Sequence, residues 1–442
     1  MFLKINQEKN NLKAKAFTLG CKVNQYETEA MLEILQANNI NIAKNDETPQ
    51  IIIINTCTVT GESDNKAKKL LRRCYREYPE SVIVLAGCFT QVAVNINELS
   101  MFADIIIGTK NRSKIYDYIS EYIDNREKII DIPKHLKGEK FEALKIKSFN
   151  ERTRAFIKIE DGCNRFCSYC IIPYARGMVR SKPLNDILEE VKGIADSGYK
   201  EIVLTGINLT AYGEDIIDQK IDLADIINAV SKIEKIERIR LGSLEPDKLN
   251  DAIINKLAVN PKLCPHFHLS LQSGCDETLK RMNRHYSCED YYKLCKKLKE
   301  VFENPSITTD IMVGFPSESD EEFKETLEFA KKIGFLKVHV FSYSVRGGTA
   351  AEKLKNHIDE NIKAKRNKIL RNEMDISQQD FLKKQIGKEL SVIFERETDG
   401  YCYGFTPQYF EIKVRGIKAL IGKNCLVKIT GYEDSCCIGS LI

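Results

Sequence analysis

Apolar runs of strand length alternate with amphipathic helical patterns along most of this 442-residue chain. In the first third, the expected strands are Ala14–Leu19, Ile51–Asn55, Val82–Ala86 and Asp104–Ile107. Helical patterns lie between them at Glu27–Asn38 and Ser63–Tyr78, with Ser63 as the expected N-cap of the second helix. Because parallel strands are joined by crossover helices, this alternation predicts an α/β domain over residues 12–135, built on a doubly wound parallel sheet.

The alternation resumes after a charged, irregular stretch around Pro133–Asn150, which we interpret as a linker. The next expected strands are Ala155–Ile159, Glu201–Thr205, Arg238–Gly242, Phe267–Leu271, Thr308–Val313 and Lys337–Ser342. Expected helices separate them at Asn185–Asp196, Leu223–Ile233, Lys248–Ala258, Asp290–Phe302 and Asp320–Ile333. About six β/α units favour a central partial (β/α)6 barrel over 150–380, with its chemistry at the carboxyl ends of the strands.

The end of the chain changes character after a basic helix expected near Glu352–Lys384. Short β runs follow, punctuated by Gly and Asp turns, at Glu389–Phe394, Tyr401–Phe405, Phe410–Val414, Cys425–Ile429 and Cys437–Leu441. This pattern predicts a small β-barrel over 383–442. No apolar run is long enough to span a bilayer and the first residues lack the apolar stretch of a signal peptide, so we expect a cytoplasmic protein without a membrane partner.

Fifteen cysteines in a chain expected to remain in a reducing compartment require an explanation other than disulfides. Cys163, Cys167 and Cys170 are spaced C-x₃-C-x₂-C on a loop that follows an expected strand. A zinc site would need a fourth nearby ligand, whereas an iron–sulfur cluster with three protein ligands leaves one iron open for substrate. The alternative is three buried cysteines that merely pack together.

A second set of three cysteines is dispersed in the sequence, but each member has the same position relative to an expected strand. Cys21, Cys57 and Cys88 each follow a different apolar strand of the first domain. Residues in this position gather along the carboxyl edge of a doubly wound sheet, where ligands bind, so we expect the three to meet. Cys74 lies inside a helical pattern and is interpreted as a packing residue, and a packing role for all three also remains open.

The segment Thr18–Met31 (TLGCKVNQYETEAM) resembles the opening motif of the methylthiotransferases, a radical S-adenosylmethionine (SAM) family, in particular the branch acting on N6-threonylcarbamoyladenosine in tRNA. Further matching segments are Cys163–Gly177, Arg180–Ser181, Leu204–Asn208, His268–Cys275 and Thr309–Pro316, and the last sixty or so residues resemble the TRAM RNA-binding barrel. The resemblance implies two 4Fe–4S clusters and SAM as cofactors. It places an auxiliary cluster on Cys21, Cys57 and Cys88, and the SAM cluster on Cys163, Cys167 and Cys170.

The resemblance also suggests where SAM and substrate bind, although each residue has an alternative as an ordinary loop residue. Candidate SAM contacts are Tyr169 near the adenine, Thr205 and Gly206 after the second strand, Ser243 and Glu245 after the third, and Gln272 and Ser273 after the fourth. Arg176 and Arg180 are candidates for a substrate phosphate or carboxylate, or else pair with an acid. His266, His268 and His339 lie in expected strands and are interpreted as core histidines.

The implied reaction is methylthiolation of carbon 2 of N6-threonylcarbamoyladenosine next to the anticodon, using two SAM molecules. Its expected partners are a tRNA anticodon loop, an electron donor such as flavodoxin or ferredoxin, and a sulfur donor that the sequence does not specify. Three alternatives are related enzymes: a methylthiotransferase for isopentenyladenosine, one for a ribosomal-protein aspartate, and a cobalamin-dependent radical SAM enzyme. The last would need an Asp-x-His-x-x-Gly motif, and the first domain has only His135. A non-enzymatic RNA-binding protein is the fourth alternative.

Overall fold

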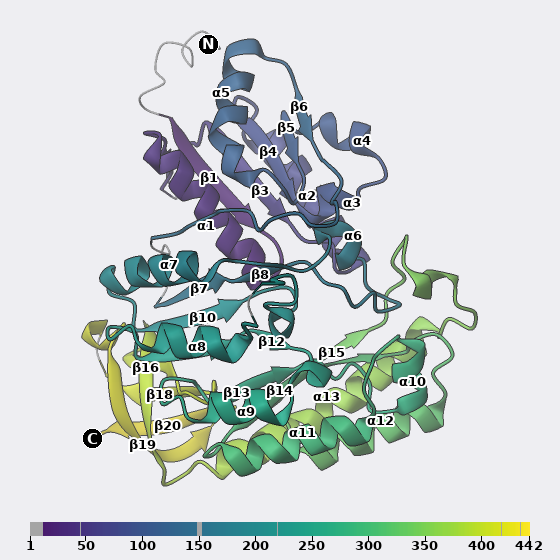
Figure 1. The fold of residues 1–442 in the computed structure, drawn as a ribbon, viewed down its shortest axis with the longest axis vertical. Helices are drawn as coiled ribbons and strands as arrows, with labels where there is room; N and C mark the ends of the chain where they lie inside the picture. Colours follow the sequence, from purple (N-terminus) through teal and green to yellow (C-terminus); the bar gives the residue numbers. More distant parts are fainter. Residues whose placement is uncertain (1–11, 45, 148–152, 219, 417, 434) are drawn as a thin grey trace.

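The computed structural model describes residues 12–44, 46–147, 153–218, 220–416, 418–433 and 435–442. The start of the chain and the last part of the expected linker, residues 148–150, lie outside this description. Figure 1 shows three groups of elements: an α/β unit at the top, a larger α/β unit in the middle and a small β-barrel at the lower left. None of the helices in the described part combines the length and apolarity needed to cross a membrane.

The first unit is a six-stranded parallel sheet in the order β2-β1-β3-β4-β5-β6. Its strands are β1 (Lys13–Thr18), β2 (Asn41–Ile42), β3 (Ile51–Thr56), β4 (Val82–Gly87), β5 (Ile105–Ile107) and β6 (Ile129–Asp131). Its helices are α1 (Lys22–Ala37), α2 (Gly61–Glu77), α3 (Cys88–Val92), α4 (Ile96–Ser100) and α5 (Ile115–Asn125). Apolar residues of α1 and α5 cover one face, and those of α2 to α4 cover the other. The sheet is therefore doubly wound, as the sequence predicts.

Helix α2 begins earlier than expected, because its N-cap is Thr60 rather than Ser63. The Thr60 hydroxyl oxygen accepts a hydrogen bond from the backbone N–H of Ser63 at 3.2 Å. Ser63 is thus the third helical residue, and the expected N-cap role belongs to Thr60, three positions earlier. Cys74 packs in the core beneath this helix, in agreement with its interpretation.

The central unit contains two parallel sheets that follow one another around a partial barrel. One has the order β11-β10-β7 and the other β12-β13-β14-β15, and an isolated bridge from Ile239 to Leu263 lies between them. The strands are β7 (Arg154–Lys158), β10 (Glu201–Thr205), β11 (Arg238–Leu241), β12 (Ser243–Leu244), β13 (His266–Leu269), β14 (Ser306–Val313) and β15 (Lys337–Ser342). The helices are α7 (Leu184–Asp196), α8 (Leu223–Ser231), α9 (Asp251–Ala258), α10 (Asp276–Arg281), α11 (Cys288–Val301), α12 (Asp320–Ile333) and α13 (Glu360–Lys383). This arrangement confirms the predicted β/α architecture.

Three short elements missed by the sequence analysis lie between β7 and α7. Strands β8 (Glu160–Asp161) and β9 (Arg180–Ser181) pair antiparallel, and helix α6 (Ile172–Arg176) lies between them. Two-residue strands carry no hydrophobic period, so the sequence could not indicate them. Together they fix both ends of the loop that carries Cys163, Cys167 and Cys170.

The last unit is a closed five-stranded barrel in the order β16-β17-β18-β20-β19. Its strands are β16 (Glu389–Thr398), β17 (Tyr401–Phe405), β18 (Glu411–Arg415), β19 (Asn424–Glu433) and β20 (Cys436–Leu441). Alternate residues such as Val392, Phe394, Ile412 and Val427 point inward and form its core. The predicted small β-barrel is confirmed.

Candidate functional site

Cys21, Cys57 and Cys88 lie at the carboxyl edge of the first sheet. Cys21 precedes α1 as its N-cap, Cys57 directly follows β3, and Cys88 is the first residue of α3 after β4. Strands β1, β3 and β4 are neighbours, and the three thiols are close enough to influence one another's ionisation. The structure thus brings the three cysteines together, as positions after adjacent parallel strands predict.

Two glycines allow this close approach. Gly20 has φ +115°, and a Cβ at this position would lie 2.5 Å from the Cβ of Cys57. Gly87 has φ +109°, and a Cβ there would lie 2.4 Å from the carbonyl oxygen of Thr56. Any larger residue before Cys21 or Cys88 would therefore force the cysteine loops apart.

Asn24 holds these loops together, and the sequence analysis assigned it no role. Its side-chain amide donates hydrogen bonds to the carbonyl oxygens of Leu19 and Thr56, both at 2.9 Å. Asn55 in turn donates to the carbonyl oxygen of Asn24 at 2.9 Å. Asn24 belongs to the segment Thr18–Met31, so the resemblance was the signal that marked this position as important.

Cys163, Cys167 and Cys170 share the loop between β8 and α6, and their thiols are also close enough to affect one another. The backbone N–H of Cys163 donates to the carbonyl oxygen of Gly177 at 3.0 Å, and that of Cys170 to the carbonyl oxygen of Cys167 at 2.9 Å. The loop is therefore tied to the end of α6 at Gly177 and folded back on itself before α6 begins.

The chemistry of both sets fits iron–sulfur clusters. Burial raises the pKa of Cys88 to about 12, and burial together with neighbouring thiols raises the pKa values of Cys163 and Cys170 to about 12. Buried thiols of this kind become thiolates when a metal centre takes the place of the protons. Among the described residues, no three His, Cys, Asp or Glu side chains converge closely enough for a single metal ion. A 4Fe–4S cluster binds each thiolate through a different iron and so needs a wider spacing.

A cavity of about 1030 Å³ opens beside the first cysteine set and extends into the partial barrel. It is lined from the first unit by Cys21 and Lys22, from the strands of the central unit by Thr205, Gly206, Ser243, His266, His268, Thr308, Asp310 and His339, and from the last unit by Phe405, Tyr409 and Phe410. All three units thus contribute to its wall. A chamber of this size can hold a nucleoside and a cofactor together.

The candidate SAM residues divide into two groups. Thr205, Gly206 and Ser243 line the cavity. Four others do not line it. Tyr169 packs against Phe315, and Glu245 forms an ion pair with Arg284 at 2.5 Å. The backbone of Gln272 forms hydrogen bonds with β14, and the Ser273 hydroxyl contacts Thr326 of α12. Only the first group therefore lies where the cavity gives a ligand room.

Glu160 was not among the candidates, although it lies between the second cysteine set and the cavity. One of its carboxylate oxygens accepts from the backbone N–H of Asn208 at 2.7 Å, while Oε1 has no partner in the described structure. Burial raises the pKa of Glu160 well above its usual value. A Cβ on Gly206 would lie 2.5 Å from this carboxylate. A cationic group such as the ammonium of SAM fits an orphaned buried carboxylate oxygen of this kind.

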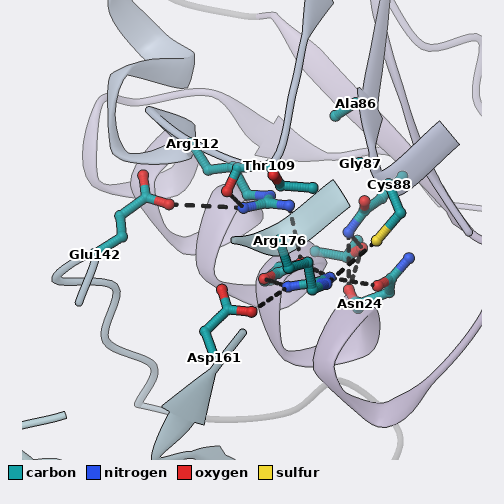
Figure 2. A network of polar contacts seen from close by, with 12 residues as sticks. Asn24, Ala86, Gly87, Cys88, Thr109, Arg112, Glu142, Asp161 and Arg176 are labelled. Atoms are coloured by element: carbon teal, nitrogen blue, oxygen red, sulfur yellow. Dashed lines mark hydrogen bonds and ion pairs between the residues drawn. The ribbon is translucent and has the colours of Figure 1, made fainter. Parts of the chain in front are cut away.

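The two candidate substrate arginines are both buried. Arg176 forms ion pairs with Glu27 at 2.8 Å and Asp161 at 3.0 Å, so the structure favours acid pairing over substrate binding for this residue (Figure 2). Arg180 donates to the carbonyl oxygens of Arg176 and Met178 and lines a separate cavity of about 490 Å³. The histidines interpreted as core residues differ from that interpretation, because His266, His268 and His339 line the cavity. His266 and His268 also bond with Thr308, both at 3.0 Å.

Solved structures that resemble this chain share its fold at low sequence identity. The radical SAM methyltransferase TsrM from Kitasatospora setae, with tryptophan substrate and a SAM analogue bound, matches with a TM-score of 0.54 and 10% identity, covering 75% of this chain and 73% of TsrM. The apo form of the cobalamin-dependent SAM radical enzyme OxsB matches with a TM-score of 0.51 and 12% identity, covering 82% of this chain and 57% of OxsB. These matches indicate a shared fold alone.

Sequence comparisons are more specific. A model of the radical SAM superfamily matches residues 157–330, and one described as uncharacterized protein family UPF0004 matches residues 13–108. The threonylcarbamoyladenosine tRNA methylthiotransferase MtaB of Bacillus subtilis is 37% identical over 94% of this chain and 93% of its own length. The MtaB protein of Aquifex aeolicus is 36% identical over 92% of this chain and 97% of its own length. The tRNA-2-methylthio-N(6)-dimethylallyladenosine synthase of Pelotomaculum thermopropionicum is 34% identical over 95% of each chain. The chain therefore belongs to the radical SAM methylthiotransferases.

Proposed function

We propose that this enzyme transfers a methylthio group to carbon 2 of N6-threonylcarbamoyladenosine next to the anticodon in tRNA. Similar relatives named for this reaction are 34–38% identical, three of them at 36–38%, and those named for the dimethylallyl reaction are 33–34% identical. The structural observation that carries the choice of substrate is a partly buried lysine in the cavity without an acidic partner. It distinguishes an anionic modification of the adenosine from an apolar one.

Lys22, the first residue of α1, lines the cavity beside Cys21. In the described part of the chain its ammonium group forms no ion pair or side-chain hydrogen bond. Burial, with Arg240 and Arg154 nearby, lowers the pKa of Lys22 to about 8, so a nearby negative charge would stabilise the ammonium form. A threonylcarbamoyl group ends in a carboxylate and would supply that charge, whereas a dimethylallyl group would leave the lysine unpaired.

The proposed cofactor ligands are the two sets of cysteines. Cys21, Cys57 and Cys88 hold the auxiliary 4Fe–4S cluster, and Cys163, Cys167 and Cys170 hold the cluster that binds SAM. When bound, the clusters and SAM supply the methylated sulfur and the radical that removes the hydrogen from carbon 2, with electrons from a donor such as flavodoxin or ferredoxin. The protein binds the base, excludes water and keeps carbon 2 within reach of both centres.

The cavity wall supports an RNA substrate. An anticodon-loop base is unpaired and can turn out of the loop into a pocket at little cost. The aromatic rings of Phe405, Tyr409 and Phe410 from the C-terminal barrel lie in the wall and offer surfaces on which a base can stack. The barrel that resembles an RNA-binding domain is thus also the part of the wall that suits a base.

The test supplies the reconstituted enzyme with tRNA carrying either threonylcarbamoyladenosine or isopentenyladenosine and analyses digested nucleosides by mass spectrometry. We expect methylthiolation of the former only. Lys22→Met should reduce kcat/KM for that tRNA by about tenfold to a hundredfold, because a charge-assisted bond is removed, and Lys22→Arg should retain most of it. Methylthiolation of isopentenyladenosine alone would refute the substrate, and a methylthiolated ribosomal-protein aspartate with no RNA product would move the protein to the sister enzymes.

A further inference from the structure

We propose that Arg176 positions the auxiliary cluster and sets its reduction potential, through a hydrogen bond to the ligand Cys88. The inference rests on the proposed function, because it requires Cys21, Cys57 and Cys88 to hold that cluster. Arg176 itself lies six residues after Cys170, at the end of α6, so it belongs to the loop of the other cysteine set.

The guanidinium of Arg176 is fully committed to protein partners. Its Nε–H donates to Sγ of Cys88 at 3.2 Å. Nη1 donates to Glu27 at 2.8 Å and Asp161 at 3.0 Å, and Nη2 donates to Asn24 at 2.8 Å and Glu27 at 3.0 Å. An arginine has five N–H donors, and each of them has a partner here. Figure 2 shows the guanidinium at the centre of these contacts, with Cys88 on one side and Asp161 on the other.

The surroundings of Arg176 carry an excess of positive charge. Glu27 is fully buried and pairs with Arg176, Lys158 and Arg112. Asp161 pairs with Arg176, Lys158 and Arg180. Four buried cations thus face two buried carboxylates, and Glu142 approaches Arg112 only at 3.6 Å from a more exposed position. Thiolate ligands and their cluster are anionic, so they would supply the negative charge that this dry site lacks.

A hydrogen bond from a cation to a cluster thiolate has a known direction of effect. The reduced cluster carries one more negative charge than the oxidised cluster, so a guanidinium beside a ligand sulfur stabilises the reduced form and raises the reduction potential. Exclusion of water strengthens this interaction, and Arg176 and Cys88 are both almost completely buried. Helices α3 and α6, which carry Cys88 and Arg176, also pack against each other, so the same contact fixes the auxiliary ligand relative to the SAM loop.

The experiment measures the reduction potentials of both clusters in the anaerobically reconstituted full-length enzyme by EPR-monitored titration. The SAM cluster is identified by the change of its signal when SAM is added. In Arg176→Lys, a point charge replaces the planar fork and cannot serve the same partners. We expect the ratio of reduced to oxidised auxiliary cluster at a fixed potential to fall about tenfold, which is about 59 mV for one electron, while the SAM cluster is unchanged.

Arg112→Lys is the matched control, because Arg112 pairs with the same Glu27 but contacts none of the six cysteines in the described structure. It should lower thermal stability to a similar degree without moving either potential. If Arg176→Lys does not fold, Arg176→Gln gives the same measurement with a larger expected shift, since the charge is removed. Loss of auxiliary iron from a folded Arg176 variant, with full iron in Arg112→Lys, also supports the proposal.

An unchanged auxiliary potential with full iron in the Arg176 variants would overturn the inference. Failure of the proposed function looks different, because the enzyme with Cys21, Cys57 and Cys88 replaced would then retain all of its iron. The two results are therefore distinguishable by iron content alone.

Discussion

The guanidinium of Arg284 lies 3.3 Å from Sγ of Cys167 and also forms an ion pair with Glu245 at 2.5 Å. Glu245 is a candidate SAM contact, and in this structure its carboxylate pairs with an arginine that contacts a cysteine of the SAM loop. Both cysteine sets thus have one buried arginine in contact with one sulfur, although the two arginines come from unrelated parts of the chain.

Replacing Arg284 by Gln should slow reductive SAM cleavage by about tenfold while iron content stays near normal. The substitution removes the positive charge beside Cys167 and leaves Glu245 without its cation, and a hydrogen bond to a charged group contributes about 1.5–3 kcal/mol. The measurement is 5′-deoxyadenosine formed with dithionite as the reductant. Arg281→Gln is the control, because Arg281 pairs with Glu322 and touches no cysteine of the loop. Equal rates in the two variants would contradict the role of Arg284.

Replacing each cysteine set by alanine should remove half of the iron. The anaerobically reconstituted protein should hold about eight irons, four in each cluster. The variant lacking Cys163, Cys167 and Cys170 should lose SAM cleavage. The variant lacking Cys21, Cys57 and Cys88 should keep SAM cleavage but lose methylthio transfer. Iron analysis and product analysis check both, and replacement of the buried Cys74 by alanine should leave the iron unchanged.

Glu201→Gln should destabilise the junction between the central unit and the C-terminal barrel by about 3 kcal/mol. Glu201 is buried and pairs with Arg154, Arg238 and Arg240, and Arg240 donates in turn to the carbonyl oxygens of residues 406 and 407. Urea unfolding measures the decrease in stability. Glu289→Gln, which removes an exposed pair with Lys293 on α11, should cost less than about 1 kcal/mol. Similar decreases in stability in both variants would argue against a role of Glu201 in stabilising this junction.

Glu201 should also make the free energy of unfolding depend on pH. Burial raises the pKa of Glu201, but Arg240 and Arg154 outweigh it and hold the pKa below its ordinary value. A carboxyl group with a lowered folded-state pKa stabilises the fold above its unfolded value of about 4.3, and this contribution disappears as the pH falls through the folded value. The wild-type protein should therefore lose stability toward acid more steeply than Glu201→Gln. Parallel curves of unfolding free energy against pH below about 5 would disagree with this account.

Neutralising exposed lysines of the C-terminal barrel should weaken tRNA binding and its salt dependence. The proposed variant replaces Lys418, Lys423 and Lys428 by Gln, and the control replaces Lys293, Lys296 and Lys331 on helices of the central unit. Each lysine–phosphate pair that the substitutions remove should reduce the slope of log K against log salt by about 0.7–0.9. Filter binding at several salt concentrations gives the slopes. A slope that falls as much in the control would place the RNA-binding surface elsewhere.

The sequence predicted those parts of the site that depend on local pattern. Cys21, Cys57 and Cys88 could be brought together because each follows an apolar strand, and parallel strands end at a common edge. The cavity-lining positions Thr205 and Ser243 follow from the same rule. The first two units were recognisable because a charged, irregular stretch interrupts the strand–helix alternation, and the third because short β runs replace that alternation.

The remaining features depend on interactions that no local pattern encodes. Arg176 meets Asn24, Glu27 and Cys88 across sequence separations of 88 to 152 residues, so its partners were not predictable from spacing. Ser273 turns toward α12 because its hydroxyl contacts Thr326, 53 residues away. Strands β2, β8 and β9 have two residues each, too few to show a period of two.

Tyr409 lies against the histidine and arginines at the base of the partial barrel, with its ring 4.9 Å from that of His266 and 4.5 Å from the guanidinium of Arg240. It comes from the turn between β17 and β18, so the appended barrel closes the floor of the chamber. A chimera that received this domain from another protein would need a matching ring at the same place. Without it, the floor of the chamber would be open to solvent. The C-terminal barrel is therefore a structural part of the chamber as well as an appended domain.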